Sequence, residues 1–78
     1  MNLRKYNELY NKMKSLIGTA RKNQRLARVV YMKPSFYKDF NRAYQSFVTK
    51  EENSKIVSIE GVPIVLKDFG KDFMIDEV

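Results

Sequence analysis

The chain has 78 residues, 15 Lys and Arg against 9 Asp and Glu, a net charge of +6, and neither cysteine nor histidine. This length predicts one small domain over residues 1–78. The lack of cysteine and histidine excludes a disulfide scaffold, a Cys/His zinc site, His-ligated haem, and catalysis by a thiol or a Ser–His pair. No apolar run is long enough to span a bilayer, and no signal-peptide core follows Met1–Lys5. We therefore expect a cytoplasmic protein that does not contact a membrane.

Charge is distributed unevenly along the chain. Residues 1–33 hold nine Lys and Arg against Glu8 alone, whereas residues 51–78 hold three Lys against seven Asp and Glu. Such an asymmetry indicates either a polyanionic partner for the basic front or self-association of the protein between front and back. The alternative is that the charges only solvate the outer face of a helix.

Apolar residues near the N-terminus recur every three or four positions, which is the period of a helix. They predict a helix over residues 2–17 or, if it continues, to Ala27, in which Gly18 either caps the helix or is tolerated. Because the spacing is heptad-like, any part of the stripe that the sheet left uncovered would favour a homodimer through this first helix. Otherwise the stripe simply covers the sheet. Its members are Leu3, Tyr6, Tyr10, Met13, Ile17 and Ala20.

A short strand and a second helix are predicted next. Residues 28–32 are β-branched or aromatic for the most part, and Lys33-Pro34 ends the run, which is typical of a strand. Ser35 is then expected to cap the second helix. The apolar side chains of that helix recur at helical spacing, at Phe36, Phe40, Ala43, Tyr44 and Phe47.

The remainder of the chain predicts three short strands separated by turns. Pro63 favours an edge position or a bulge for the strand that contains it. The order helix, strand, helix, three strands predicts an α+β fold with a small, mainly antiparallel sheet. We expect a basic helical front over 1–27 and a compact core over 28–78, in which the aromatic stripe of the second helix packs on the sheet. The segments are a polar turn (49–54), a strand (55–59), a turn at Glu60-Gly61, a strand (62–67), a turn (68–72) and a strand (73–75).

The sequence offers no catalytic constellation. Asp68-Phe69-Gly70 spells the metal-binding triplet of protein kinases, but the chain has neither the glycine-rich loop nor the HRD motif, so the triplet predicts a turn. Carboxylates near the C-terminus are of the type that Mg²⁺ accepts, but their spacing is not that of an EF-hand and no second acidic cluster completes a two-metal site. We expect no enzyme, no cofactor and no metal. The carboxylates in question are Asp68, Asp72, Asp76 and Glu77.

The densest run of cations follows the first helix stripe. Between Arg21 and Arg28 lie four cations and two amides, and guanidinium groups pair well with phosphate. Helical spacing would place Arg21, Arg25 and Arg28 along one face, with Lys14 above them. The pattern predicts a non-enzymatic binding module for a polyanion, most simply nucleic acid. Because no helix-turn-helix or zinc-finger pattern occurs, an acidic protein surface is the alternative partner. The candidate binding residues are Lys14, Arg21, Lys22, Arg25 and Arg28.

Residues 29–76 also carry a series of short motifs in a recognisable order. These are Met32-Lys33-Pro34 at a strand end, Phe36-Tyr37 at a helix start, Ile56-Val57-Ser58-Ile59, Gly61, Pro63-Ile64-Val65-Leu66 and Met74-Ile75-Asp76. In this order the chain resembles the axial domain of tailed-phage major capsid proteins. There a strand, a "Pro-x-x-Tyr" helix start and an "Ile-x-Gly-x-Pro-Val" hairpin follow one another. Those proteins are several times longer and have an extended arm and a long spine helix that this chain lacks, so the resemblance is to a fragment.

The resemblance implies a small protein of a phage or mobile element and supplies no catalytic residues. It also defines the alternative function, a protein-interaction factor that docks on an acidic surface. Such a factor would be a phage accessory protein, an inhibitor of a host protein, or a small structural component of the virion. We accordingly expect the protein in the host cytoplasm, or in the virion if its role is structural.

Overall fold

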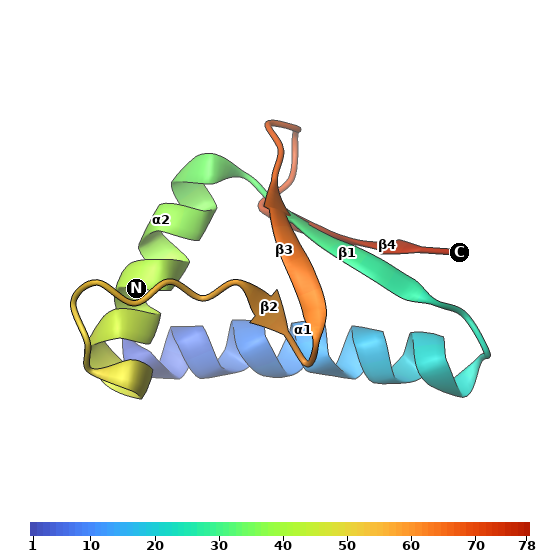
Figure 1. The fold of residues 1–78 in the computed structure, drawn as a ribbon, viewed down its shortest axis with the longest axis horizontal. Helices are drawn as coiled ribbons and strands as arrows, with labels where there is room; N and C mark the ends of the chain where they lie inside the picture. Colours follow the sequence, from blue (N-terminus) through green and yellow to red (C-terminus); the bar gives the residue numbers. More distant parts are fainter.

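The computed structural model describes residues 1–78 and confirms the α+β class (Figure 1). Two helices, one π-helical segment and four strands follow the predicted order of helix, strand, helix and strands. The elements are α1 (Leu3–Lys22), β1 (Ala27–Met32), α2 (Pro34–Ala43), η1 (Tyr44–Thr49), β2 (Ser58–Ile59), β3 (Val62–Leu66) and β4 (Phe73–Glu77).

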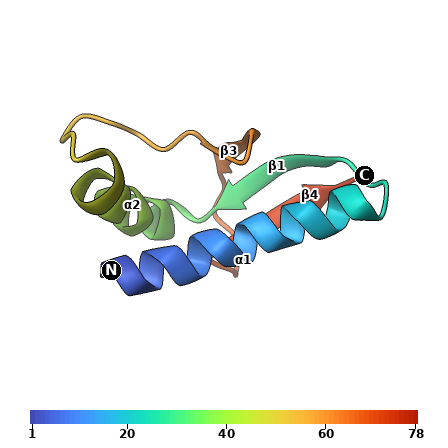
Figure 2. The same cartoon turned by 90° about the horizontal axis from the view of Figure 1, so that it is seen from below.

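The strands form one mixed sheet in the order β2-β3-β1-β4. The central strand β1 is parallel to β3, and α2 with η1 provides the long crossover that a parallel pair requires. β1 is antiparallel to β4, and β2 is antiparallel to β3, so the sheet is mainly antiparallel as predicted. Val30 lies between Ile64 and Ile75 across three strands, and all three side chains pack in the core. The helices lie on this face of the sheet (Figure 2).

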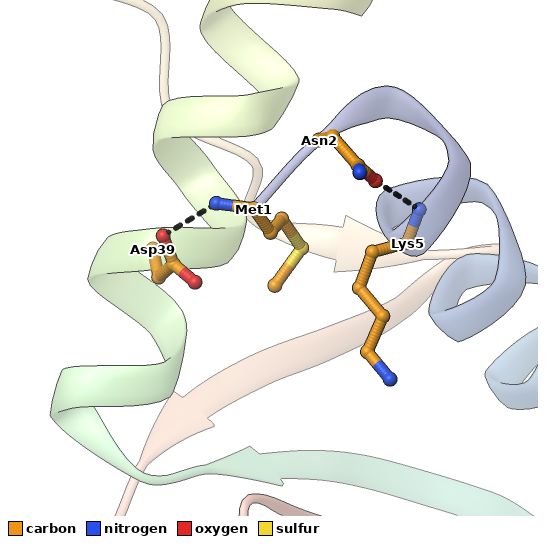
Figure 3. Close-up of polar contacts among 4 residues, drawn as sticks. All are labelled: Met1, Asn2, Lys5 and Asp39. Atoms are coloured by element: carbon orange, nitrogen blue, oxygen red, sulfur yellow. Dashed lines mark hydrogen bonds and ion pairs between the residues drawn. The ribbon is translucent and has the colours of Figure 1, made fainter.

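Helix α1 begins with a side-chain cap and ends with a left-handed residue. The Asn2 side-chain oxygen accepts the backbone N–H of Lys5 at 2.8 Å, which satisfies one of the free donors of the first turn (Figure 3). Beside this cap the amino group of Met1 contacts Asp39 of α2 at 2.9 Å. The helix stops at Lys22, where Gln24 adopts a φ of 58°. Gly18 is therefore tolerated within the helix and does not cap it.

Helix α2 starts differently from the prediction. Pro34 occupies the first helical position, which suits its fixed φ, and Lys33 precedes the helix without a side-chain cap. Ser35 therefore lies inside the first turn, and the prediction that it caps the helix is wrong. Beyond Ala43 the chain continues as the π-helix η1, whose wider turns rotate each successive side chain less than an α-helix does. Phe47 consequently leaves the predicted stripe and is 42% exposed.

The β2–β3 hairpin turns through Glu60 and Gly61, as predicted. Both residues have positive φ, 50° and 82°, as a two-residue hairpin turn of type I′ requires, and glycine meets that requirement without strain. Pro63 lies on β3, which is the second strand from the edge, so an edge position for it is wrong. Pro63 faces Ser58 at a non-hydrogen-bonded pair, so its backbone N points toward β1. It is tolerated there because the ladder between β1 and β3 begins only at Ile64. The predicted strand 55–59 is reduced to Ser58–Ile59.

The core joins the sheet to both helices. α2 packs beside the N-terminal half of α1, whereas β1 and β4 lie beside its C-terminal half (Figures 1 and 2). Phe40 of α2 is fully buried and stacks on Tyr6 of α1, with 4.7 Å between ring centroids. Met13 and Ile17 continue the contact of α1 with the core. The basic front of the sequence thus supplies part of the same hydrophobic core as residues 28–78.

The apolar stripe of α1 is largely used within the monomer. Tyr6, Met13, Ile17 and Ala20 are at most 4% exposed, which matches the alternative in which the stripe covers the sheet. Leu3 is 42% exposed. The homodimer through the first helix therefore stays a prediction with little apolar surface to support it. None of the helices is both long enough and apolar enough to cross a membrane.

Candidate polyanion-binding surface

Three of the five candidate cations lie on α1. Lys14, Arg21 and Lys22 are exposed. Lys14 and Arg21 are seven residues apart, about two helical turns, so they share one flank of the helix. Arg21 and Lys22 occupy the last turn, where positive side chains interact favourably with the helix dipole. Neither Lys14 nor Lys22 has a carboxylate partner, so both remain available to an anion.

Arg21 connects the helix to the β2–β3 turn. Its Nη2 donates to the backbone carbonyl of Glu60 at 2.9 Å, and the Tyr10 hydroxyl donates to the Glu60 carboxylate at 3.2 Å. These contacts hold the hairpin tip against α1. A guanidinium group has five donors, so this single bond leaves most of Arg21 free to contact a phosphate.

Arg25 and Arg28 are not on the helix, and the prediction that they share a helical face with Arg21 is wrong. α1 ends at Lys22, Arg25 follows in the turn, and Arg28 lies on β1. Each guanidinium pairs with a carboxylate of β4, Arg25 with Glu77 at 3.4 Å and Arg28 with Asp76 at 3.1 Å. The acidic C-terminal segment therefore folds against the end of the basic front and neutralises part of it.

The two ion pairs do not remove Arg25 and Arg28 from consideration. Their side chains are 64% and 55% exposed, and exposed ion pairs contribute only about 0–1 kcal/mol. A phosphate can therefore replace the carboxylate beside either guanidinium at a free-energy cost of about 0–1 kcal/mol. The structure thus divides the candidate residues into a free group on α1 and a partly neutralised group at the β1–β4 end of the sheet.

Two cations outside the predicted set lie on the opposite flank of α1. Lys5 and Lys12 are also seven residues apart and exposed, and the ammonium of Lys12 lies 5.9 Å from the ring centroid of Phe73. Their heptad spacing was visible in the sequence. The spacing alone, however, does not show that the two lysines lie on an exposed flank, because that depends on which side of the helix is buried.

A cavity of about 440 Å³ opens between α1, η1 and the segment before β2. Burial raises the pKa of Tyr6 to about 12, and the neighbouring Tyr10 and Tyr44 act in the same direction. Burial also raises the pKa of Tyr10, beside the Glu60 carboxylate. The Tyr6 hydroxyl has no partner within the protein and is not a buried unpaired group, so it meets solvent at this cavity. Among the lining residues are Tyr6, Asn7, Tyr10, Tyr44, Val48 and Ser58.

The acidic residues of the C-terminal segment do not converge. No group of three or more His, Cys, Asp or Glu side chains is arranged to hold a metal ion. Asp76 and Glu77 are directed to arginines, and Glu60 is exposed at the hairpin turn.

Comparisons with known proteins do not extend this description. No family model, no curated protein and no solved structure matches the chain. The resemblance of residues 29–76 to capsid axial domains therefore stays a prediction.

Proposed function

We propose that the protein is a non-enzymatic binding module of the cytoplasm whose helix α1 engages the phosphates of a nucleic acid. The observation that carries the proposal is the charge of that helix. α1 holds six cations against Glu8, all are exposed, and only Arg4 has a carboxylate partner. Cations in this arrangement release counterions from a nucleic acid on binding, which favours association independently of base sequence.

The placement of the cations on α1 suits a groove or a backbone track. Lys14 and Arg21 lie on one flank, Lys5 and Lys12 on the other, and the small side chain of Ser15 lies on the solvent side between them. A helix with its side chains is about 10–12 Å wide, close to the ~12 Å width of a B-DNA major groove. Both flanks can then approach phosphates at once.

The proposal predicts a steep dependence of affinity on salt. Fluorescence anisotropy with random duplex DNA, single-stranded DNA and RNA probes should show binding whose log affinity falls linearly with log salt, by about 0.9 per duplex phosphate neutralised. The triple variant Lys14→Ala, Arg21→Ala, Lys22→Ala should reduce that slope by about three units on duplex DNA, whatever the probe sequence.

The control variant removes the same charge from another surface. Lys38→Ala, Arg42→Ala, Lys50→Ala also deletes two lysines and one arginine, but these residues lie in α2 and beyond it. It should retain most of the slope. Equal losses in both variants would reduce the effect to net charge alone, and no binding to any probe at low salt would overturn the proposal.

A second candidate function, docking on an acidic protein, is favoured by the other face of the sheet. Tyr31 lies on that face between Val65 and Met74, and these two are 44% and 38% exposed. A cation borders the patch, because the ammonium of Lys67 lies 4.9 Å from the Tyr31 ring centroid. An apolar centre with a charged rim is typical of protein interfaces.

The two candidates give opposite results in one purification. If a protein is the partner, it should copurify after nuclease treatment and be lost from a Val65→Asp, Met74→Asp variant. Alanine in place of the cations should mainly slow its association. If nucleic acid is the partner, nuclease should remove what copurifies, and the sheet variant should bind DNA as the wild type does.

A further inference from the structure

The two edges of the sheet differ in their capacity to pair with another strand. β2 has only two residues, whereas β4 has five and borders the sheet on the opposite side. An edge strand of that length presents a row of unpaired backbone donors and acceptors to solvent. No proline interrupts β4.

The ladder shows which backbone groups of β4 are free. Leu26 and Val78 exchange both hydrogen bonds, at 3.3 and 2.9 Å, and the N–H of Lys33 donates to the carbonyl of Asp72 at 2.9 Å. Because hydrogen-bonded pairs alternate along an antiparallel ladder, even-numbered residues of β4 face β1. The N–H and C=O groups of Phe73, Ile75 and Glu77 therefore point away from the sheet.

The side chains of those same residues line a groove of about 460 Å³ between α1 and β4. The Phe73 end of the groove is basic on balance, because Lys12 and Lys71 lie there with Asp72. The other end carries the Glu77 carboxylate, which also pairs with the exposed Arg25 at 3.4 Å. The 41% exposed Leu16 contributes from α1. When the β4 strand of a second copy runs antiparallel to the first, the Phe73 end of each groove faces the Glu77 end of the other. The basic end of each copy then meets the carboxylate of the other copy.

We propose that the protein forms a symmetric homodimer by antiparallel pairing of β4 with β4 of a second copy. With the two-fold axis at Ile75, Phe73 lies opposite Glu77 of the partner subunit, and Ile75 lies opposite its own equivalent. All the outward backbone groups of both strands then face one another in hydrogen-bonded pairs. Lys12 of each subunit comes beside Glu77 of the partner subunit, twice in the dimer.

This arrangement joins two sheets into one of eight strands and keeps both α1 helices on the same face. The interface is small, one strand and one groove per subunit, so dimers should form in the micromolar to millimolar range. The dimer does not depend on the proposed function. It leaves Lys14, Arg21 and Lys22 free, but it shares Lys12 with the second flank of α1 that the proposed function assigns to phosphate contact.

Charge reversal tests the pairing directly by sedimentation equilibrium. The wild type should approach twice its monomer mass of 9.2 kDa as concentration rises. Glu77→Lys places two lysines together at each end of the interface, and Lys12→Glu places two glutamates together, so each variant alone should be monomeric. An equimolar mixture of the two variants restores both ion pairs and should dimerise at least as well as the wild type.

Glu52→Lys is the matched control, because Glu52 is exposed in the turn before β2 and far in sequence from β4. It makes the same charge change and should dimerise normally. Hydrogen exchange adds a second measurement, since the amides of Phe73 and Ile75 should gain protection with concentration. A wild type that stays monomeric at millimolar concentration, or a mixture that fails to dimerise, overturns the proposal. Binding of an added extended peptide to β4 without self-association would show that the edge serves another chain.

Discussion

Replacement of Phe40 by alanine is expected to destabilise the protein by about 3–5 kcal/mol. Phe40 is fully buried, stacks on Tyr6 of α1 at 4.7 Å and on Phe36 at 5.7 Å, and so joins the two helices. Truncation leaves a cavity that the surrounding rings cannot fill without giving up their own contacts. Since the free energy of unfolding of small domains is only about 5–15 kcal/mol, this loss is a large fraction of the total stability.

Urea unfolding followed by circular dichroism measures this loss. Phe47→Ala is the control, because it deletes the same ring from η1, which continues α2, but at a position that is 42% exposed. It should cost less than about 1 kcal/mol. Equal losses in the two variants would mean that the stripe packs as the sequence pattern suggested, with Phe47 in the core.

Phe40 and Phe47 show where helical spacing in the sequence predicts burial correctly and where it does not. Buried residues of α1, and Phe40 and Ala43 of α2, were predicted because an α-helix repeats its faces along the sequence. The prediction fails at Phe47, where the chain changes to a π-helix. No propensity in the sequence indicates that change.

Strand pairing was predictable only in part, because it depends on segments far apart in the chain. The Glu60-Gly61 turn fixes the local hairpin, so β2 and β3 were expected together. The parallel pairing of β1 with β3, and the position of β4 at an edge, follow from tertiary packing and could not be read from local pattern.

The same limit applies to the candidate site. The sequence shows how many cations there are, but it does not show which of them are paired with carboxylates in the fold. Arg25 and Arg28 pair with carboxylates about fifty residues away in the chain. Within one chain the basic front and the acidic back meet at this end of the sheet, whereas self-association of separate copies through front and back stays a prediction. Of the five candidate cations, the three that remain exposed without a carboxylate partner are on α1, and this is why the proposed function rests there.

The protein is expected to lose stability at alkaline pH because folding buries tyrosine side chains. Burial raises the pKa of Tyr6 from its ordinary value of 10.0 to about 12, and burial also raises the pKa of Tyr10 and of Tyr37. The folded state therefore holds these phenols in their neutral form more strongly than the unfolded state does. That contribution to stability is fully present below pH 10 and is lost as pH rises through 12.

For Tyr6 alone, the raised pKa corresponds to less than about 3 kcal/mol of lost stability across that interval, because the hydroxyl meets solvent at the cavity and its charge is screened there. Tyr6→Phe keeps the ring that stacks on Phe40 and removes a hydroxyl that has no partner within the protein. The variant should match the wild type at neutral pH and lose stability less steeply above pH 10, as urea unfolding at a series of pH values would measure. Curves for the two proteins that fall in parallel would contradict this assignment and place the titrating group at Tyr10 or Tyr37, where a second phenylalanine substitution would find it.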